Sequence, residues 1–181
     1  CVSRYGIGEC LYRFDQQMQP QPYLADSVKS NDDNTQWTFH IRDGVKFSNG
    51  KELTPSAVKK SIEYTFKQEE DGKGTAHPSQ FLKYESIEAD DESGNLTIKT
   101  SQAYADLSAV LANPLFVIVD VDADTDMADQ PIGTGPYAVV KKNEGTSIEM
   151  EANEHYWNGD VPYEKLNVIF IKDATSKYMA L

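Results

Sequence analysis

Residues 37–50 read WTFHIRDGVKFSNG, and the organisation of the rest of the chain follows from them. Apolar residues alternate with polar ones from Trp37 to Ile41, which is the period-2 pattern of a half-buried β-strand. Asp43-Gly44 then predicts a tight hairpin turn, because glycine adopts positive φ at little cost. The alternation resumes over residues 45–47, so we expect a returning strand there. The stretch contains no catalytic group.

A capped helix is predicted directly after this stretch. Thr54-Pro55 combines an N-cap residue with a proline at the first helical position. Val58 and the residues four, seven and eight positions after it form one apolar stripe, made of Val58, Ile62, Thr65 and Phe66. We expect the helix to end in the charged loop of residues 68–74.

The remaining elements are predicted from the same kinds of pattern. Apolar residues at helical spacing predict a helix over residues 5–14 and a short one over 104–111. Alternating residues predict hairpins of 84–89 with 96–100 and of 136–142 with 147–152. Unbroken apolar runs predict buried strands at 114–121 and 166–171, and Asp173 is expected to cap a helix at the end of the sequence.

Bulk composition excludes several classes of function. The chain has 181 residues, enough for one core or two small ones. Its net charge of −12 disfavours nucleic acid as a partner, because binding phosphate needs clustered Lys and Arg. Mean hydropathy is −0.56, and the sequence has no apolar run long enough to span a membrane. The acidic balance mainly indicates solubility.

The sequence resembles a known family at several motifs that occur in the family's order. The matching segments are GECL (residues 8–11), LADS (24–27), WTFHIRDGVKFSNGKELTPSAVKKSIEY (37–64), IGTGPY (132–137), NEHYWNG (153–159) and DATS (173–176). They are similar to the signature of the peptide/nickel class (family 5) of extracellular solute-binding proteins, the receptors of ABC importers.

The resemblance implies a fold and a domain organisation. The fold class is α/β (mixed α+β): a lobe like that of type II periplasmic-binding proteins, with an inserted small α+β domain. Residues 37–121 would form the inserted domain, and residues 1–36 and 122–181 parts of the first main lobe. The second lobe of the clamshell would lie beyond residue 181. Both ends look cut, so we expect a fragment whose targeting signal is missing.

The resemblance also implies a function. The protein would be the substrate-binding component of an ABC importer, a monomer that captures peptides outside the membrane and delivers them to the permease, with no cofactor and no catalysis. It would work in the periplasm or on the extracellular face of the cytoplasmic membrane, lipid-anchored at full length. Acylation of Cys1 itself is disfavoured, because the family match resumes too soon after it to leave room for a tether.

Candidate ligand-binding residues come from the same resemblance. The segment before the GECL motif approaches the ligand in this class, as does the segment from Asn113 to Phe116. The residues implied are Cys1, Ser3, Arg4, Tyr5, Asn113 and Phe116. Arg4 would pair with a ligand carboxylate, or equally with a local Asp or Glu.

The choice between peptides and a metal chelate depends on where the cations lie. Some nickel-binding relatives carry an arginine near the position of Phe116. This chain has no Arg or Lys between Lys99 and Lys141. That favours peptides and leaves a receptor for nickel or a metal chelate as the alternative. A surface adhesion module and an acidic enzyme with a composite site are the alternatives from other classes.

Other chemistry finds little support in the sequence. Asp122, Asp124 and Asp126 imitate the start of a calcium loop, but Met127 and Gly133 stand where the loop needs glycine and glutamate. The three histidines lack zinc-site spacing, so no metal site is expected. Cys1 and Cys10 are not expected to form a disulfide, and the sequence carries no hydrolase or nucleotide-binding motif.

Overall fold

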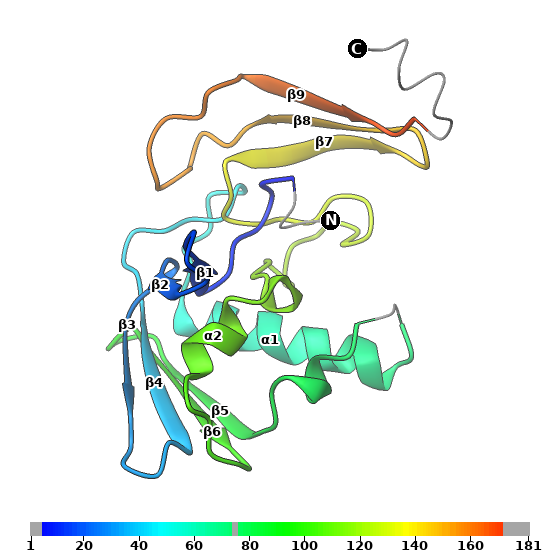
Figure 1. Cartoon of the computed structure of the whole chain (residues 1–181). Coiled ribbons are helices and arrows are strands. Elements are labelled where there is room, and N and C mark those ends of the chain that lie inside the picture. The colour runs from blue at the N-terminus through cyan, green and yellow to red at the C-terminus, as the bar shows by residue number, and fades with distance from the viewer. Residues whose placement is uncertain (1–4, 74–75, 172–181) are drawn as a thin grey trace.

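The computed structural model describes residues 5–73 and 76–171. Two sheets lie at opposite ends of the molecule, with a small hairpin and a short helix between them (Figure 1). In chain order the elements are β1 (Tyr12–Phe14), β2 (Pro20–Pro22), β3 (Ala25–Ser30), β4 (Gln36–Ile41), α1 (Pro55–Glu70), η1 (Pro78–Gln80), β5 (Tyr84–Asp90), β6 (Asn95–Thr100), α2 (Leu107–Leu111), η2 (Pro114–Phe116), β7 (Tyr137–Asn143), β8 (Ser147–Ala152) and β9 (Lys165–Ile169).

The larger sheet has the strand order β3-β4-β6-β5, with every pair antiparallel. Trp37 lies opposite Ile98 and Phe39 opposite Leu96, so the apolar residues of β4 and β6 share one face. Helix α1 packs on β5 and β6. The half-buried strand and the 84–100 hairpin predicted from the sequence are therefore confirmed.

Helix α1 begins as the sequence predicts. The Thr54 hydroxyl accepts a hydrogen bond from the Ala57 backbone N–H at 3.2 Å, and Pro55 follows at the first helical position. Val58 and Ile62 on the predicted apolar stripe are fully buried in the larger core. The cap and the stripe thus fix both the start of the helix and the face that it buries.

The returning strand predicted at residues 45–47 is wrong. β4 already lies between β3 and β6, so both of its edges are occupied. The chain turns at Gly44 (φ +74°), and residues 45–47 instead pair with residues 51–53 across the next turn. The Phe47 N–H donates to the Lys51 carbonyl at 2.8 Å, and the Leu53 N–H to that of Val45 at 2.8 Å.

The helix predicted at residues 5–14 is also wrong. Gly6 has a φ of +73°, outside the right-handed helical region. The carbonyls of this segment bond distant residues: Gly6 accepts from Tyr137 at 3.0 Å and Ile7 from Gly135 at 2.9 Å. The segment is extended and ends in β1, because its backbone hydrogen bonds are made across the fold rather than along a helix.

The buried strand predicted at residues 114–121 is wrong in form. The segment starts as the 3-10 turn η2 and continues as extended chain with two isolated bridges, Glu9 with Ile118 and Val119 with Gly133. Because successive residues pair with different segments, no continuous ladder forms. The burial that the apolar run predicts is nevertheless present at Ile118 and Val119.

The second sheet has the order β7-β8-β9, and its first hairpin is confirmed. It carries a separate small core: Ile7, Tyr137, Val139, Ile148 and Met150. The final strand was predicted to be buried, but β9 alternates between half-buried and exposed residues; among the described residues it pairs with β8 alone. The helix predicted from Asp173 lies outside the described residues.

The predicted domain division stays a prediction. The first predicted domain boundary lies between residues 36 and 37. β3 pairs with β4 across this boundary along most of its length, from Ala25 opposite Ile41 to Ser30 opposite Trp37. Residues 25–30 therefore share a sheet with the segment 37–121. In the described part of the chain, no helix is long and apolar enough to cross a membrane.

Asp120 fastens the 45–53 segment to the rest of the chain. Its buried carboxylate contacts Lys51 Nζ at 2.8 Å and accepts a hydrogen bond from the Asn49 amide at 2.8 Å. Burial by itself raises the pKa of Asp120, but the hydrogen bonds from Lys51 and Asn49 outweigh it, so the pKa lies below its ordinary value of 3.8. The folded state therefore stabilises the charged form.

We predict that Asp120→Asn lowers the free energy of unfolding by roughly 1–2 kcal/mol near neutral pH. Because the folded-state pKa is lowered, this contribution is fully present above pH 3.8 and is lost as the pH falls through the folded value. Urea unfolding at pH 7, 4.5 and 3 measures it. Asp124→Asn, at an exposed carboxylate, is the control; equal effects of the two substitutions at pH 7 would contradict the prediction.

Candidate functional site

A buried carboxylate joins four distant segments of the chain. Glu9 is 8% exposed. One of its oxygens accepts hydrogen bonds from the hydroxyls of Tyr23 (2.8 Å) and Tyr156 (3.3 Å). The other accepts from the Thr134 hydroxyl (2.8 Å) and from Trp157 Nε1 (2.9 Å). These five residues form what we term the Glu9 cluster, in which every carboxylate oxygen has two donors.

The cluster depends on a close approach between two backbone segments. A Cβ on Gly133 would lie 2.1 Å from the Ile7 carbonyl oxygen, and one on Gly135 would lie 2.4 Å from that of Gly6. Both distances are shorter than any real contact, so only glycine fits at either position. Thr134 lies between the two glycines, and this close approach brings its hydroxyl to Glu9.

We predict that Gly133→Ala destabilises the fold by on the order of 3 kcal/mol or more, because backbone must move to admit the methyl group. Gly44→Ala is the control: Gly44 lies in a turn, and nothing lies within 4 Å of its added Cβ. Its positive φ should cost only about 1–2 kcal/mol. Thermal unfolding followed by circular dichroism ranks the two, and a milder effect at Gly133 would refute the clash.

Two arginines stack on the aromatic rings of the cluster. Tyr23 and Trp157 meet edge to face, with 5.2 Å between ring centroids. The Arg13 guanidinium lies 4.6 Å from the centroid of the Tyr23 ring, and the Arg42 guanidinium lies 5.1 Å from that of Trp157. Arg42 also donates through Nε to the Tyr23 carbonyl at 2.9 Å. Cation–π contact thus places one cation at each end of the aromatic pair.

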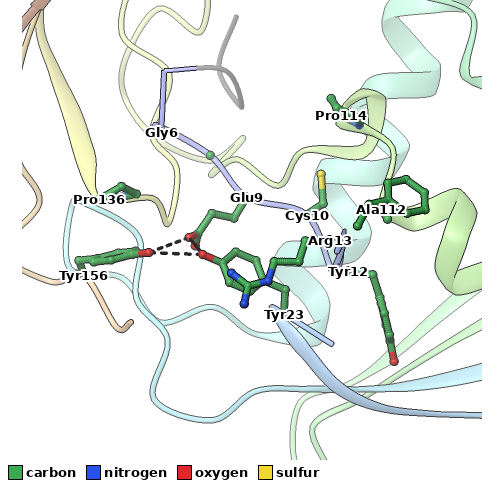
Figure 2. Close-up of a pocket in the computed structure, with 12 residues that line it drawn as sticks. Gly6, Glu9, Cys10, Tyr12, Arg13, Tyr23, Ala112, Pro114, Pro136 and Tyr156 are labelled. Atoms are coloured by element: carbon green, nitrogen blue, oxygen red, sulfur yellow. Dashed lines mark hydrogen bonds between the residues drawn. The ribbon is translucent and has the colours of Figure 1, made fainter. Parts of the chain in front are cut away.

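An open pocket of about 460 Å³ adjoins the cluster (Figure 2). We term it the Arg13 pocket; it is lined by Gly6, Gly8, Glu9, Cys10, Tyr12, Arg13, Phe14, Tyr23, Ala112, Pro114, Pro136 and Tyr156. Its size is that of a small-molecule site. Aromatic rings, prolines and glycines form most of the wall, and Glu9 and Arg13 are its charged members.

Burial keeps the titratable groups beside the carboxylate protonated. Burial first, and the nearby Glu9 charge second, raise the pKa of the Cys10 thiol to about 12. Burial likewise raises the pKa of the Tyr23 and Tyr156 hydroxyls above the ordinary value. At neutral pH Cys10 is therefore a thiol rather than a reactive thiolate, and both hydroxyls keep their protons.

We predict that Glu9→Gln lowers the free energy of unfolding by roughly 1–3 kcal/mol, because the amide nitrogen cannot accept from the donors that it then faces. Trp157 Nε1 can only donate, so the network cannot fully reverse its direction. Chemical denaturation measures the change. Glu88→Gln, on an exposed residue of β5, is the control, and a Glu9 effect no larger than that of Glu88 would count against the cluster.

The ligand-binding residues predicted from the resemblance lie in different places. Cys1, Ser3 and Arg4 fall outside the described residues. Tyr5 is half-buried beside the second sheet, with its ring 6.4 Å from that of Phe170.

Of the predicted segment from Asn113 to Phe116, neither end residue lines the pocket. The Asn113 side chain caps η2, accepting from the Leu115 N–H at 3.0 Å, while the residues on either side of it line the Arg13 pocket. The ring of Phe116 is 1% exposed and belongs to the core. Ligand contact by Tyr5, Asn113 and Phe116 stays a prediction.

Sequence reasoning missed Arg13, Tyr23 and Tyr156 as pocket residues. Tyr156 lies inside the NEHYWNG motif, and Glu9 lies inside GECL, so the motifs themselves were the available signal. The sequence did not show that these motifs lie together, because they meet through contacts between residues more than a hundred positions apart.

The histidines lie at separate places. His40 Nδ1 is 2.9 Å from Asp26, His77 Nδ1 is 3.2 Å from Glu69, and His155 Nε2 is 3.6 Å from Glu154. Among residues 5–73 and 76–171, no group of three or more His, Cys, Asp or Glu side chains is arranged to hold a metal ion. In the acidic loop, Asp122 pairs with Lys60.

Comparison with known proteins identifies the class. A family model described as bacterial extracellular solute-binding proteins, family 5 Middle, matches residues 19–181. The chain therefore belongs to the bacterial extracellular solute-binding proteins, which are binding proteins outside the cell or in the periplasm. Among them it belongs to family 5, and its mixed α/β fold is that of the family.

Individual relatives differ in the ligand that they are named for. The nickel-binding protein NikA of Staphylococcus aureus is 31% identical over 178 residues, covering 96% of this chain and 34% of that protein. Its crystal structure with Ni(L-His)2 matches with a TM-score of 0.86 at 30% identity, over 97% of this chain and 36% of that one. The dipeptide-binding protein DppE of Bacillus subtilis is 28% identical over 95% of this chain and 35% of its own length. The chain thus spans about a third of these relatives.

Proposed function

We propose that the protein captures a small ligand outside the cytoplasmic membrane and delivers it to an ABC permease. The observation that carries this proposal is the Arg13 pocket, a cavity of about 460 Å³ at the point where several family motifs meet. The GECL and NEHYWNG motifs both supply its wall, through Glu9 and Tyr156. Family membership supports the same role.

Capture in this proposal is a binding equilibrium and involves no reaction. The ligand bridges two lobes, and the hinge closes because the closed form binds the ligand more tightly than the open form does. The groups beside the pocket suit this role: Cys10 stays a neutral thiol, and the Tyr23 and Tyr156 hydroxyls act as hydrogen-bond donors. We therefore propose that the protein is not an enzyme and uses no cofactor.

Peptides are the proposed ligands, and nickel chelates are the second candidate. The apolar residue at Phe116, in a stretch without Lys or Arg, favours peptides. The names of the relatives favour nickel as much as dipeptides. Both ligand classes carry carboxylates, since a dipeptide ends in one and Ni(L-His)2 contains one on each histidine.

The surrounding organisation is proposed on the same basis. The segment 37–121 would form an inserted small domain, with 1–36 and 122–181 in the first main lobe. Tyr5 and Asn113 would approach the ligand together with the segment before Tyr5. The full-length protein would be a lipid-anchored monomer. A surface adhesion role is the alternative from another class, and an absence of small-ligand binding would favour it.

Isothermal titration of the protein at its full natural length tests the proposal. We expect dissociation constants in the micromolar range or tighter for the dipeptide Ala-Ala or for Ni(L-His)2 prepared from Ni²⁺ and L-histidine. Residues 1–181 alone should bind the same probes far more weakly, because one wall cannot enclose a ligand. Equal affinity of the two proteins would contradict the two-lobe mechanism, and binding of neither probe by the full-length protein would contradict capture.

A further inference from the structure

We propose that Arg13 recognises a carboxylate of the captured ligand in the Arg13 pocket. Arg13 lies in β1, which is paired with β2 in a two-stranded hairpin, with Arg13 opposite Gln21. The hairpin holds the residue at the wall of the pocket, and Figure 2 shows its side chain across the ring of Tyr23. This inference rests on the proposed function and adds the chemical group that the site selects.

The guanidinium of Arg13 is positioned without its donors being used. The guanidinium carbon lies 4.6 Å from the centroid of the Tyr23 ring, and this cation–π contact holds the group beside the pocket. Among residues 5–73 and 76–171, no carboxylate lies within ion-pair distance of Arg13, and its side chain donates no hydrogen bond. An oriented guanidinium fork matches the two oxygens of a carboxylate.

Arg42 provides the internal comparison. It too stacks on an aromatic ring, that of Trp157, but its Nε donates to the Tyr23 carbonyl. Arg42 is therefore tied into the fold and is not part of the pocket wall, whereas Arg13 is. Both arginines make a cation–π contact, but Arg42 also bonds the backbone of the cluster, whereas Arg13 lines the pocket.

Glu9 and Arg13, the two charged residues of the pocket wall, form no ion pair. Each Glu9 oxygen already accepts two hydrogen bonds from the cluster, so the carboxylate has no capacity left for a guanidinium partner. The four donor dipoles point toward Glu9 and stabilise its charge within the cluster. A ligand carboxylate at Arg13 therefore meets one exposed cation, while the apolar walls at Phe14, Pro114 and Pro136 accommodate the rest of the molecule.

Matched probes with and without a carboxylate test the inference on the full-length protein. The first pair is Ala-Ala and its C-terminal amide; the second is Ni²⁺ with L-histidine and Ni²⁺ with histamine, which is histidine without its carboxylate. We expect Arg13→Gln to weaken binding of the carboxylate member about tenfold and to leave the other member unchanged. Arg13→Lys, which keeps the charge without the fork, should weaken it about threefold.

Lys29→Gln is the matched control, because it also removes one exposed positive charge but lies on β3, outside the pocket wall. It should leave all four affinities unchanged. Equal losses for both members of a pair in Arg13→Gln, or no loss for either, would overturn the inference while leaving capture intact. A wild-type protein that binds no member of either pair would overturn the proposed function and this inference together.

Discussion

A carboxylate removed from water is stable in a protein only when hydrogen-bond donors surround it, and Glu9 imposes that requirement on this fold. Its four donors come from Tyr23, from Thr134 and from the adjacent pair Tyr156 and Trp157. Backbone hydrogen bonds also join these segments, as between β1 and β2 and from the Gly135 N–H to the Ile7 carbonyl, and the carboxylate links their side chains at one point. The pocket follows from that arrangement, since Glu9, Tyr23 and Tyr156 are also part of its wall. The need of the buried Glu9 charge for hydrogen-bond donors therefore also determines part of the pocket wall.

The Thr134 hydroxyl reaches Glu9 only because two backbone segments approach closely. The IGTGPY motif allows this approach because a glycine stands on each side of the threonine. Gly133 and Gly135 lie against the carbonyls of Ile7 and Gly6, and the intervening Thr134 is completely buried. The same backbone is bonded to the 37–50 stretch by a hydrogen bond from the Ser48 N–H to the Gly133 carbonyl at 2.9 Å. Motifs that lie far apart in the sequence are therefore parts of one contact region. Some supply a hydrogen-bonding side chain, and others supply a glycine that allows two backbones to approach.

The sequence predicted best those elements that their own residue pattern determines. The alternation at Trp37–Ile41 is confirmed because it reports which face of the strand is buried, and the Thr54 cap and both hairpins are confirmed because they involve residues close along the chain. Prediction failed over residues 5–14, where apolar spacing suggested a helix but Ile7 and Leu11 enter two different cores. It also failed where pairing partners are remote, as at Ile118 with Glu9. The site belongs to this second group: Glu9, Thr134, Tyr156 and Trp157 lie inside motifs, but the sequence did not show that they are neighbours, and Arg13 and Tyr23 lie outside the motifs.

The same physical arrangement supports the proposed role in ligand capture. Catalysis by an acid, base or nucleophile needs a group whose proton is readily gained or lost near neutral pH. In the described part of the pocket, burial holds the proton on the Cys10 thiol, and the Tyr23 hydroxyl is engaged with Glu9. What remains available at the surface is a fixed cation, several aromatic faces and proline rings. Such groups discriminate among ligands by shape and charge, and because they are held by the cluster rather than by the ligand, little ordering is needed when a ligand arrives.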